Sequence, residues 1–204
     1  MRRFVLLLVI MTGSTSPAVS TERAPVRSLL EMRHDRVIVQ EWDLSCGAAV
    51  VATLLTYQHQ DPVEERDIAL SLVQREEYMD NPDLLRVRQG FSLLDLKRYV
   101  ESRGYQGIGY GQLTVEDLVE RAPIAVPVDF DGYNHFVVFR GLVNGRVLLA
   151  DPAWGNRTMP VEEFEDAWLV YRDIGRVGFV IANPDGSLPP NRMAPRAEDF
   201  VMFR

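Results

Sequence analysis

The sequence predicts an α+β protein in which a mostly helical first half packs on a second half of antiparallel strands. Three observations support this fold class. A run of small and aliphatic residues without proline follows Cys46 and predicts a buried helix. Residues 92–103 have the apolar spacing of an amphipathic helix. From Ile124 onward, apolar runs of strand length dominate, and the turn Asn144-Gly145 separates two of them.

The N-terminal residues have the pattern of a secretory signal. Arg2 and Arg3 precede an apolar run that is short for a bilayer span, and Ala18-Val19-Ser20 fits a cleavage site. We therefore expect residues 1–20 to be removed and the mature protein to be periplasmic, without a transmembrane segment. A retained N-terminal anchor is the alternative.

Three segments are expected after the signal. Residues 21–35 are polar and charged and predict a mobile leader. Residues 36–182 contain the predicted helices and strands and form one domain. Residues 183–204 include four prolines and predict an extended, poorly ordered tail. The formal net charge of −7 becomes more negative when the two signal arginines are removed, which argues against nucleic acid as a partner.

Cys46 is the only cysteine of the chain, so it cannot form an internal disulfide. The predicted helix begins at or just before it, with Asp43 or Ser45 placed to cap the N-terminus. A thiol at this position lies at the positive end of the helix dipole, which favours the thiolate. The alternative is that Cys46 serves only as a small hydrophobic core residue.

The rest of the helical half contains two further helices and a charged segment. Residues 62–73 fit a helix with proline in the first turn, and Ser92 caps the helix over residues 92–103. Residues 74–90, rich in Glu, Arg and Asp, are the expected mobile loop. The sequence leaves open whether this segment is a substrate flap or a solvated connector.

The second half is mainly strands. A strand over residues 105–110 and a short helix over 114–121, with Thr114 and Asp117 in capping-box spacing, lead into it. The predicted strands after that helix are 124–128, 135–142, 146–150 and 178–182, with a helix over 161–169 between the last two.

His135 and Asp151 are candidate site residues because they lie at the same end of a predicted hairpin. If the strands pair around Asn144-Gly145, His135 is opposite a position near Trp154, within a few residues of Asp151. The carboxylate can then bind the imidazole and fix its tautomer. A cysteine, a histidine and an acid in these roles make a thiol nucleophile, its base and the group that orients the base.

Gln40 completes the candidate site. Its side-chain amide, six residues before Cys46, and the Cys46 backbone N–H can both donate to one developing oxyanion. A metal site fits poorly, because His34 and His59 have no ligand-like spacing with other histidines or with the cysteine. We expect no metal and no cofactor.

Several of these residues carry a resemblance to a known family. Gln40, Asp43, Cys46-Gly47-Ala48-Ala49, Asn134-His135-Phe136-Val137-Val138 and Asp151-Pro152 resemble the papain-fold cysteine peptidases that process bacteriocin leaders after a double glycine. The likeness covers residues 36–182. It implies a papain-like fold with Cys46 as nucleophile, His135 as base, Asp151 as its orienter and Gln40 as oxyanion donor.

The chain also departs from the common form of that family, which is the N-terminal domain of an export ATPase. It has no phosphate-binding loop and opens on a secretion signal, so it is more similar to free-standing periplasmic members such as the peptidase of functional-amyloid (Fap) operons. This implies an exported cysteine endopeptidase that cleaves a secreted or outer-membrane-associated protein or peptide, in association with a secretion system. The alternatives are a peptidoglycan amidase, an acyltransferase on the same fold, or a non-catalytic peptide-binding module.

Overall fold

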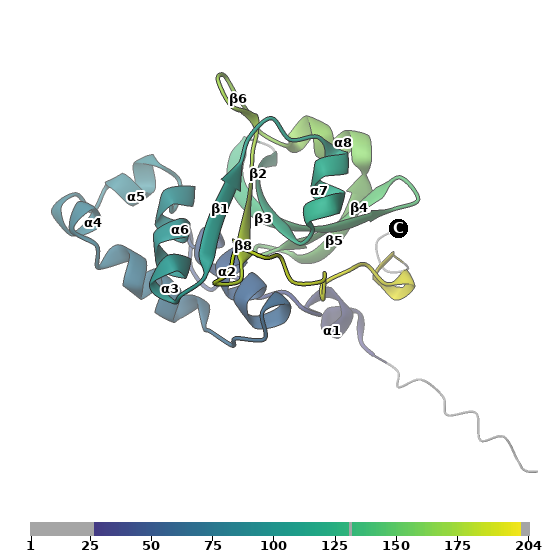
Figure 1. The fold of residues 1–204 in the computed structure, drawn as a ribbon, viewed down its shortest axis with the longest axis horizontal. Coiled ribbons are helices and arrows are strands. Elements are labelled where there is room, and N and C mark those ends of the chain that lie inside the picture. Colours follow the sequence, from purple (N-terminus) through teal and green to yellow (C-terminus); the bar gives the residue numbers. More distant parts are fainter. Residues whose placement is uncertain (1–26, 131, 201–204) are drawn as a thin grey trace, which may run out of the picture.

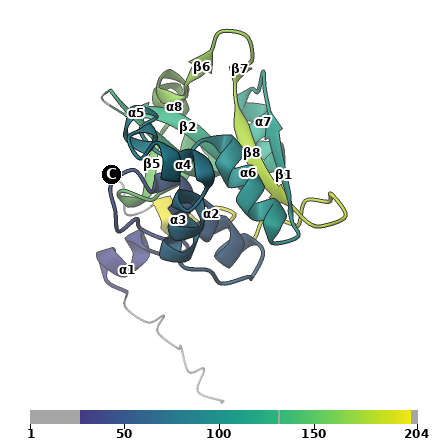
Figure 2. The ribbon, with the colours of Figure 1, turned by 90° about the vertical axis from the view of Figure 1, so that its left-hand side faces the viewer.

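The computed structural model describes residues 27–130 and 132–200 of the chain. The expected signal peptide, residues 1–20, lies outside them. Two layers are visible in Figure 1, a group of helices and an antiparallel sheet, and Figure 2 shows the same arrangement from the helical side. The helices of the first layer are α1 (Leu29–Arg33), α2 (Cys46–Thr53), α3 (Glu65–Val73), α4 (Glu76–Asp80), α5 (Leu84–Val87) and α6 (Leu93–Ser102).

Helix α2 is the centre of the helical layer. Its small side chains allow close packing, and a Cβ atom added at Gly47 would lie 3.2 Å from Leu96 of α6. All eight residues of α2 are buried, and a π-helical turn over Leu54–Gln58 extends the helix. Helix α6 begins with the predicted cap, because Ser92 and Asp95 form a reciprocal capping box.

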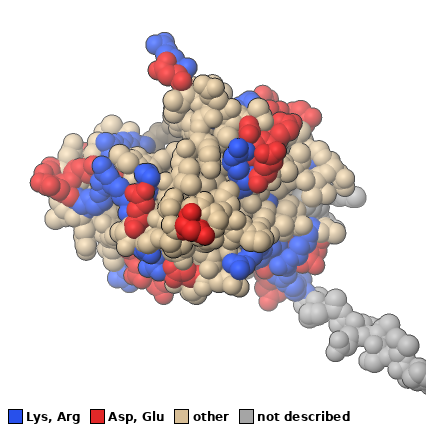
Figure 3. Space-filling model, in the orientation of Figure 1, with Lys and Arg blue, Asp and Glu red and all other residues tan. Residues whose placement is uncertain are grey.

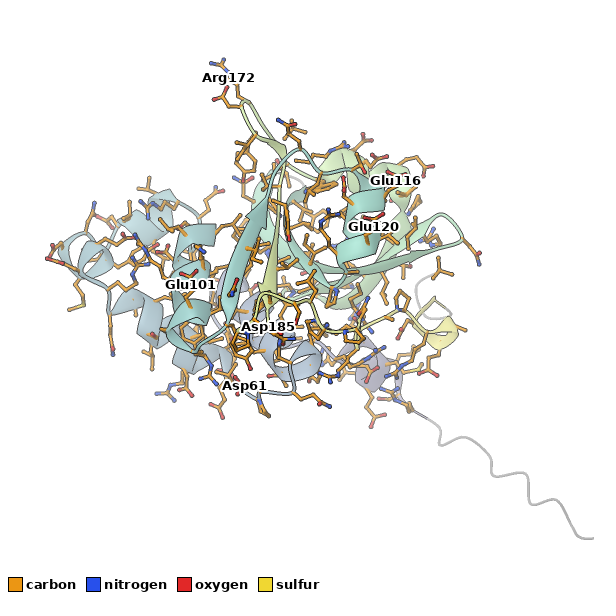
Figure 4. The ribbon with its side chains drawn as sticks, viewed as in Figure 1. Asp61, Glu101, Glu116, Glu120, Arg172 and Asp185 are labelled. Atoms are coloured by element: carbon orange, nitrogen blue, oxygen red, sulfur yellow. The ribbon has the colours of Figure 1, made fainter. Side chains whose placement is uncertain are left out.

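Within the described residues, six strands form one sheet in the order β1-β8-β2-β3-β4-β5, with antiparallel pairing throughout. Strand β5 and the short hairpin β6–β7 were not predicted. The hairpin projects from the molecule, with Arg172 at its tip pointing into solvent (Figure 4). The strands are β1 (Gln106–Tyr110), β2 (Ile124–Phe130), β3 (Tyr133–Val143), β4 (Arg146–Asp151), β5 (Gly155–Pro160), β6 (Val170–Tyr171), β7 (Gly175–Arg176) and β8 (Gly178–Ala182).

Each face of the sheet has its own hydrophobic core, because successive strand residues point to opposite sides. Ala125 and Val138 face the helical layer and pack with α2, α3 and α6. Val126 and Val137 face the other way and pack beneath α7 (Val115–Arg121) and α8 (Val161–Ala167). Glu116 and Glu120 lie on the solvent side of α7 (Figure 4). The predicted α+β class, with a helical lobe on an antiparallel sheet, is therefore confirmed.

The charged segment 74–90 is not an irregular loop, since it forms the short helices α4 and α5. A buried carboxylate organises it. Asp95 of α6 accepts hydrogen bonds from Arg75 and from the Tyr78 hydroxyl, the latter at 2.6 Å. Burial and the bond to Asp95 raise the pKa of Tyr78 to about 12. These contacts join residues 20 and 17 positions apart, which local sequence patterns do not reveal.

The two ends of the described chain pack against the domain where the sequence predicts a mobile leader and a poorly ordered tail. Residues 29–33 of the leader form α1, which Ser28 caps, and Asn156 of β5 donates to the carbonyl of Asp35 at 2.6 Å. In the tail, Met193 is fully buried and its carbonyl accepts from the Arg140 side chain at 2.8 Å. Hydrogen bonds from side chains to backbone carbonyls, together with the buried side chains of Met193 and Asp199, therefore hold segments whose composition suggests little structure.

Gly155 is the point at which α1 meets β5, and replacing it tests this contact. Its φ is 93°, and an added Cβ atom would lie 2.7 Å from the backbone oxygen of Arg33. We expect Gly155→Ala to lower the free energy of unfolding by about 2 kcal/mol or more, through left-handed strain and this clash. Gly145→Ala is the matched control, since Gly145 has φ 73° but no neighbour within 4 Å. Urea denaturation should show the larger loss for Gly155→Ala, and equal losses would contradict the proposed packing.

Candidate active site

Cys46 is the first residue of α2, and 2% of its surface is exposed. The predicted start of the helix is confirmed, but the predicted side-chain cap is not. Ser45 occupies the N-cap position without bonding an amide of the helix. Its hydroxyl instead lies 2.6 Å from the carbonyl oxygen of Trp42 and contacts the carboxylate of Glu65. The N-terminus of α2 is therefore held through the preceding loop.

His135 and Asp151 come from the predicted hairpin, β3–β4. Near the turn, Val143 pairs with Arg146 and Leu142 with Val147, and an irregularity between Phe139 and Gly141 then shifts the register by one residue. His135 is 4% exposed and Asp151 2% exposed. Nε2 of His135 lies 2.8 Å from Oδ1 of Asp151. The hairpin therefore brings the imidazole and the carboxylate together as the sequence predicts.

Two further groups hold the Asp151 carboxylate. The backbone N–H of Ala153 donates to Oδ1 at 2.9 Å, and Arg157 of β5 donates to Oδ2 at 3.2 Å. The Arg157 guanidinium also lies 4.4 Å from the centre of the Phe130 ring. Burial alone would raise the pKa of Asp151, but the His135 bond and charge, with these two donors, hold it below the usual value. Arg157 was missed because β5 itself was not predicted.

The environment of His135 favours the imidazolium. Burial alone would lower the pKa of His135, but the hydrogen bond to Asp151, the interaction with Cys46 and the negative charge of Asp151 outweigh it. Together they raise the pKa of His135 to about 9. Nδ1 has no partner in hydrogen-bonding geometry among the described residues. Because Nε2 is occupied by Asp151, Nδ1 is the ring nitrogen left for the nearby thiol.

Cys46 and His135 line one cavity of about 410 Å³ between the two layers. On the helical side, residues 88–93 border it, so the end of the charged segment reaches the site. Asn134 donates to Gln89 across this cavity at 2.8 Å. The other lining residues are apolar or aromatic, namely Pro127, Phe136, Leu169, Tyr171, Ile174 and Val177. The wall of the cavity beyond residues 88–93 is therefore mainly apolar.

Gln40 lies beside the turn that follows Asp151, and it is not among the residues that line the cavity of Cys46 and His135. Its backbone N–H donates to the carbonyl of Pro152 at 2.8 Å, which joins it to the turn after Asp151. Its side-chain amide donates to the carbonyl of Trp42 at 2.9 Å. An amide nitrogen carries two hydrogens, so one remains for another acceptor. The oxyanion role that the sequence suggests for Gln40 stays a prediction.

The pKa of His135 leads to a prediction about stability. Because folding raises this pKa from 6.5 to about 9, the stabilisation is complete below pH 6.5 and is lost as the pH rises through 9. The free energy of unfolding of the wild type, measured in urea and compared with that of His135→Gln, should fall by about 3 kcal/mol over that pH window. His59→Gln is the control, since burial lowers the pKa of His59 and its contribution stays constant there. A wild-type advantage that does not change with pH would contradict the imidazolium assignment.

Three further features of the described residues concern metal binding, membrane spans and surface charge. They contain no group of three or more His, Cys, Asp or Glu residues placed to hold a metal ion. None of the helices in the described ranges is both long and apolar enough to cross a membrane. Acidic and basic side chains are interspersed on the face shown in Figure 3, so this face carries no extended patch of one sign.

A cysteine at the start of a buried helix, facing a histidine that an acid holds from a neighbouring strand, is the arrangement of papain-like cysteine peptidases. The chain belongs to the peptidase C39 family, whose model matches residues 34–172. Two relatives named "Probable functional amyloid protease FapD" match 90% of this chain and 84% of their own length. The protein from Pseudomonas aeruginosa is 31% identical, and that from Pseudomonas fluorescens is 33% identical.

Solved structures agree on the fold. A double glycine motif protease from an AMS/PCAT transporter, solved in complex with the leader peptide, has a TM-score of 0.55 and 24% identity. It matches 71% of this chain and 89% of its own. The peptidase domain of Streptococcus ComA has a TM-score of 0.57 and 17% identity, over 74% of this chain and 99% of its own. The papain-like fold that the sequence predicts is confirmed.

Proposed function

We propose that this protein is an exported cysteine endopeptidase that cleaves a protein or peptide substrate during secretion of a functional amyloid. Membership of the peptidase C39 family supports peptide-bond hydrolysis, and the names of the two Pseudomonas relatives support the amyloid context. The observation that carries the mechanism is the His135–Asp151 hydrogen bond of 2.8 Å beside Cys46, at the wall of one cavity.

The first chemical step forms a thioester. The thiolate of Cys46 attacks the carbonyl carbon of the scissile bond, and the carbonyl oxygen becomes an oxyanion. His135, charged because its pKa is about 9, transfers its Nδ1 proton to the leaving nitrogen. The carbon–nitrogen bond then breaks and the first product leaves as a free amine. Asp151 keeps Nε2 protonated and the ring oriented throughout.

The second step hydrolyses the thioester. His135, now neutral, accepts a proton from a water molecule as the water attacks the thioester carbonyl. A second oxyanion forms, and its collapse expels the Cys46 thiolate and releases the other product as a carboxylic acid. The proton stays on His135, so the ion pair is restored.

Both steps develop negative charge on one oxygen, which hydrogen-bond donors must stabilise. The free hydrogen of the Gln40 amide and the backbone N–H of Cys46 are the proposed donors, and the N-terminus of α2 adds its dipole. Removing one such donor typically costs on the order of 10²–10³ in rate.

The surroundings of the site favour an extended, largely uncharged substrate segment. A second cavity, of about 390 Å³, is lined by residues 42–45 of the loop before Cys46, and Phe91 lines both cavities. The rest of the wall of this second cavity is mainly apolar and includes Trp42, Leu70 and Leu85. Residues 1–20 would export the chain to the periplasm, where a secretion system would present a secreted or outer-membrane-associated substrate.

The test is digestion of two substrates by the purified protein, with Cys46→Ala as the matched control. One is a peptide library prepared from periplasmic and outer-membrane proteins, with new termini identified by mass spectrometry. The other is purified peptidoglycan, with released fragments identified in the same way. New peptide termini made only by the wild type would support the proposal. Release of cell-wall fragments alone would favour the amidase alternative, and peptide binding without any cleavage would favour the binding module.

A further inference from the structure

Glu65 is a buried acidic residue outside the proposed catalytic set. It begins helix α3 and is 4% exposed, whereas its neighbours Glu64 and Arg66 are exposed. It forms no ion pair among the residues that the structure describes. A buried carboxylate is costly unless hydrogen bonds compensate for the lost hydration. The bonds that Glu65 accepts therefore indicate what this residue is placed to hold.

Both bonds go to the loop that precedes Cys46. The backbone N–H of Glu41 donates to Oε2 of Glu65 at 2.8 Å, and the hydroxyl of Ser45 contacts Oε1. Glu41 directly follows Gln40, and Ser45 directly precedes Cys46. One side chain therefore holds the two residues adjacent to the two proposed oxyanion donors, which lie six positions apart in the sequence.

The same network reaches the amide of Gln40. The Ser45 hydroxyl lies between Glu65 and the carbonyl of Trp42, at 2.6 Å from the latter. That carbonyl also accepts one hydrogen of the Gln40 amide at 2.9 Å. A hydroxyl has a single hydrogen, so Ser45 serves one of its two acceptors at a time. Glu65 thus acts on the orientation of the Gln40 amide through the Ser45 hydroxyl and the Trp42 carbonyl.

Backbone strain shows that this loop needs an external restraint. Leu44 has a φ of 69°, in the left-handed region that side chains other than glycine seldom adopt. Such a conformation costs on the order of 1–3 kcal/mol and persists only where the surroundings enforce it. The contacts of Glu65 at both sides of Leu44 supply that restraint.

We infer that Glu65 is a positioning residue that fixes the spacing and direction of the oxyanion donors, Gln40 and the Cys46 N–H. This inference rests on the proposed function, since it assigns Glu65 to the same reaction. It predicts that replacing Glu65 slows the reactions of Cys46 that pass through an oxyanion. The rates of reactions without an oxyanion should stay the same.

Two reactions of Cys46 separate these cases without a known peptide substrate. With p-nitrophenyl acetate, the thiolate bonds to the acetyl carbon through a tetrahedral oxyanion, and p-nitrophenolate leaves with the electron pair of the broken carbon–oxygen bond. With iodoacetamide, the thiolate displaces iodide from a saturated carbon, and no oxyanion forms. The rates would be measured for the wild type, Glu65→Gln and the exposed neighbour variant Glu64→Gln, after subtraction of the Cys46→Ala background.

We expect Glu65→Gln to slow acylation about tenfold or more, since one oxyanion donor is typically worth on the order of 10²–10³. Alkylation should stay within about twofold, and Glu64→Gln should leave both rates unchanged. On a Gln40→Ala background, Glu65→Gln should cost much less, because the two residues act as one unit. If Glu65→Gln does not fold by circular dichroism, Ser45→Ala removes one side of the same network and takes its place.

Two results would overturn the inference alone. Unchanged acylation would show that Glu65 does not position the donors, and equal losses in both reactions would show that it only supports helix α2. A wild-type Cys46 that p-nitrophenyl acetate cannot acylate would overturn the proposed function as well, and the Cys46→Ala background distinguishes that case.

Discussion

Replacing Cys46 by alanine should reduce peptide cleavage to the uncatalysed background, a loss on the order of 10⁴–10⁶ in kcat. The thiolate forms the bond to the substrate carbonyl, and the structure offers no second thiol, since Cys46 is the only cysteine of the chain. Cys46→Ser should be almost as inactive, because a serine hydroxyl is a much weaker nucleophile at neutral pH. The rates would be measured on a peptide that the wild type cleaves.

Folding must be established for both variants, and the site makes this straightforward. The Cys46 side chain is small and buried, so the near-isosteric serine should preserve the circular dichroism spectrum and the packing of α2. A folded Cys46→Ser or Cys46→Ala variant that retains wild-type cleavage would remove the nucleophile from the mechanism.

Replacing His135 by alanine should cause a loss of similar size, because His135 protonates the leaving group and then activates water. The double variant Cys46→Ala/His135→Ala should be no less active than either single variant, since the effects of residues in one catalytic unit are strongly non-additive.

Asp151→Ala should retain more activity than His135→Ala, because Asp151 orients His135 without exchanging a proton with the substrate. Single-turnover rates on the same peptide measure all of these.

His59→Ala is the matched control for this series. His59 is half-buried, its Nε2 lies 2.9 Å from the carbonyl oxygen of Ile181, and its ring packs against Tyr105. It is not among the residues that line the cavity of Cys46. It should therefore leave cleavage intact, and a folded His135→Ala variant with the same activity would exclude the proposed base.

Local patterns in the sequence predicted most of the fold and the contact between His135 and Asp151. The capping boxes of Ser92 and Thr114 were predictable because each joins residues three positions apart. His135 and Asp151 were predictable because the Asn144-Gly145 turn fixes which strand ends meet. The apolar character of the helix after Cys46 placed the cysteine at a buried helix start.

The features that sequence reasoning missed depend on contacts between distant segments. Glu65 lies within the predicted helix over residues 62–73, and only the three-dimensional structure brings it to Glu41 and Ser45. Arg140 lies within an apolar strand, yet it is fully buried and donates to Met193 and Asn156. Burial lowers the pKa of Arg140 to about 10. The packing of the tail could not be predicted without these partners.

The most direct test of the whole account is the reaction of native Cys46 with iodoacetamide near pH 7. A charged imidazolium beside a thiol favours the thiolate, and the cavity gives the reagent access to a side chain that is only 2% exposed. We expect one carbamidomethyl group on Cys46 in the folded protein, found by mass spectrometry, and a slower reaction in His135→Ala. Modification of Cys46 only after denaturation would show instead that it is an inert core residue, and the proposed mechanism would fail with it.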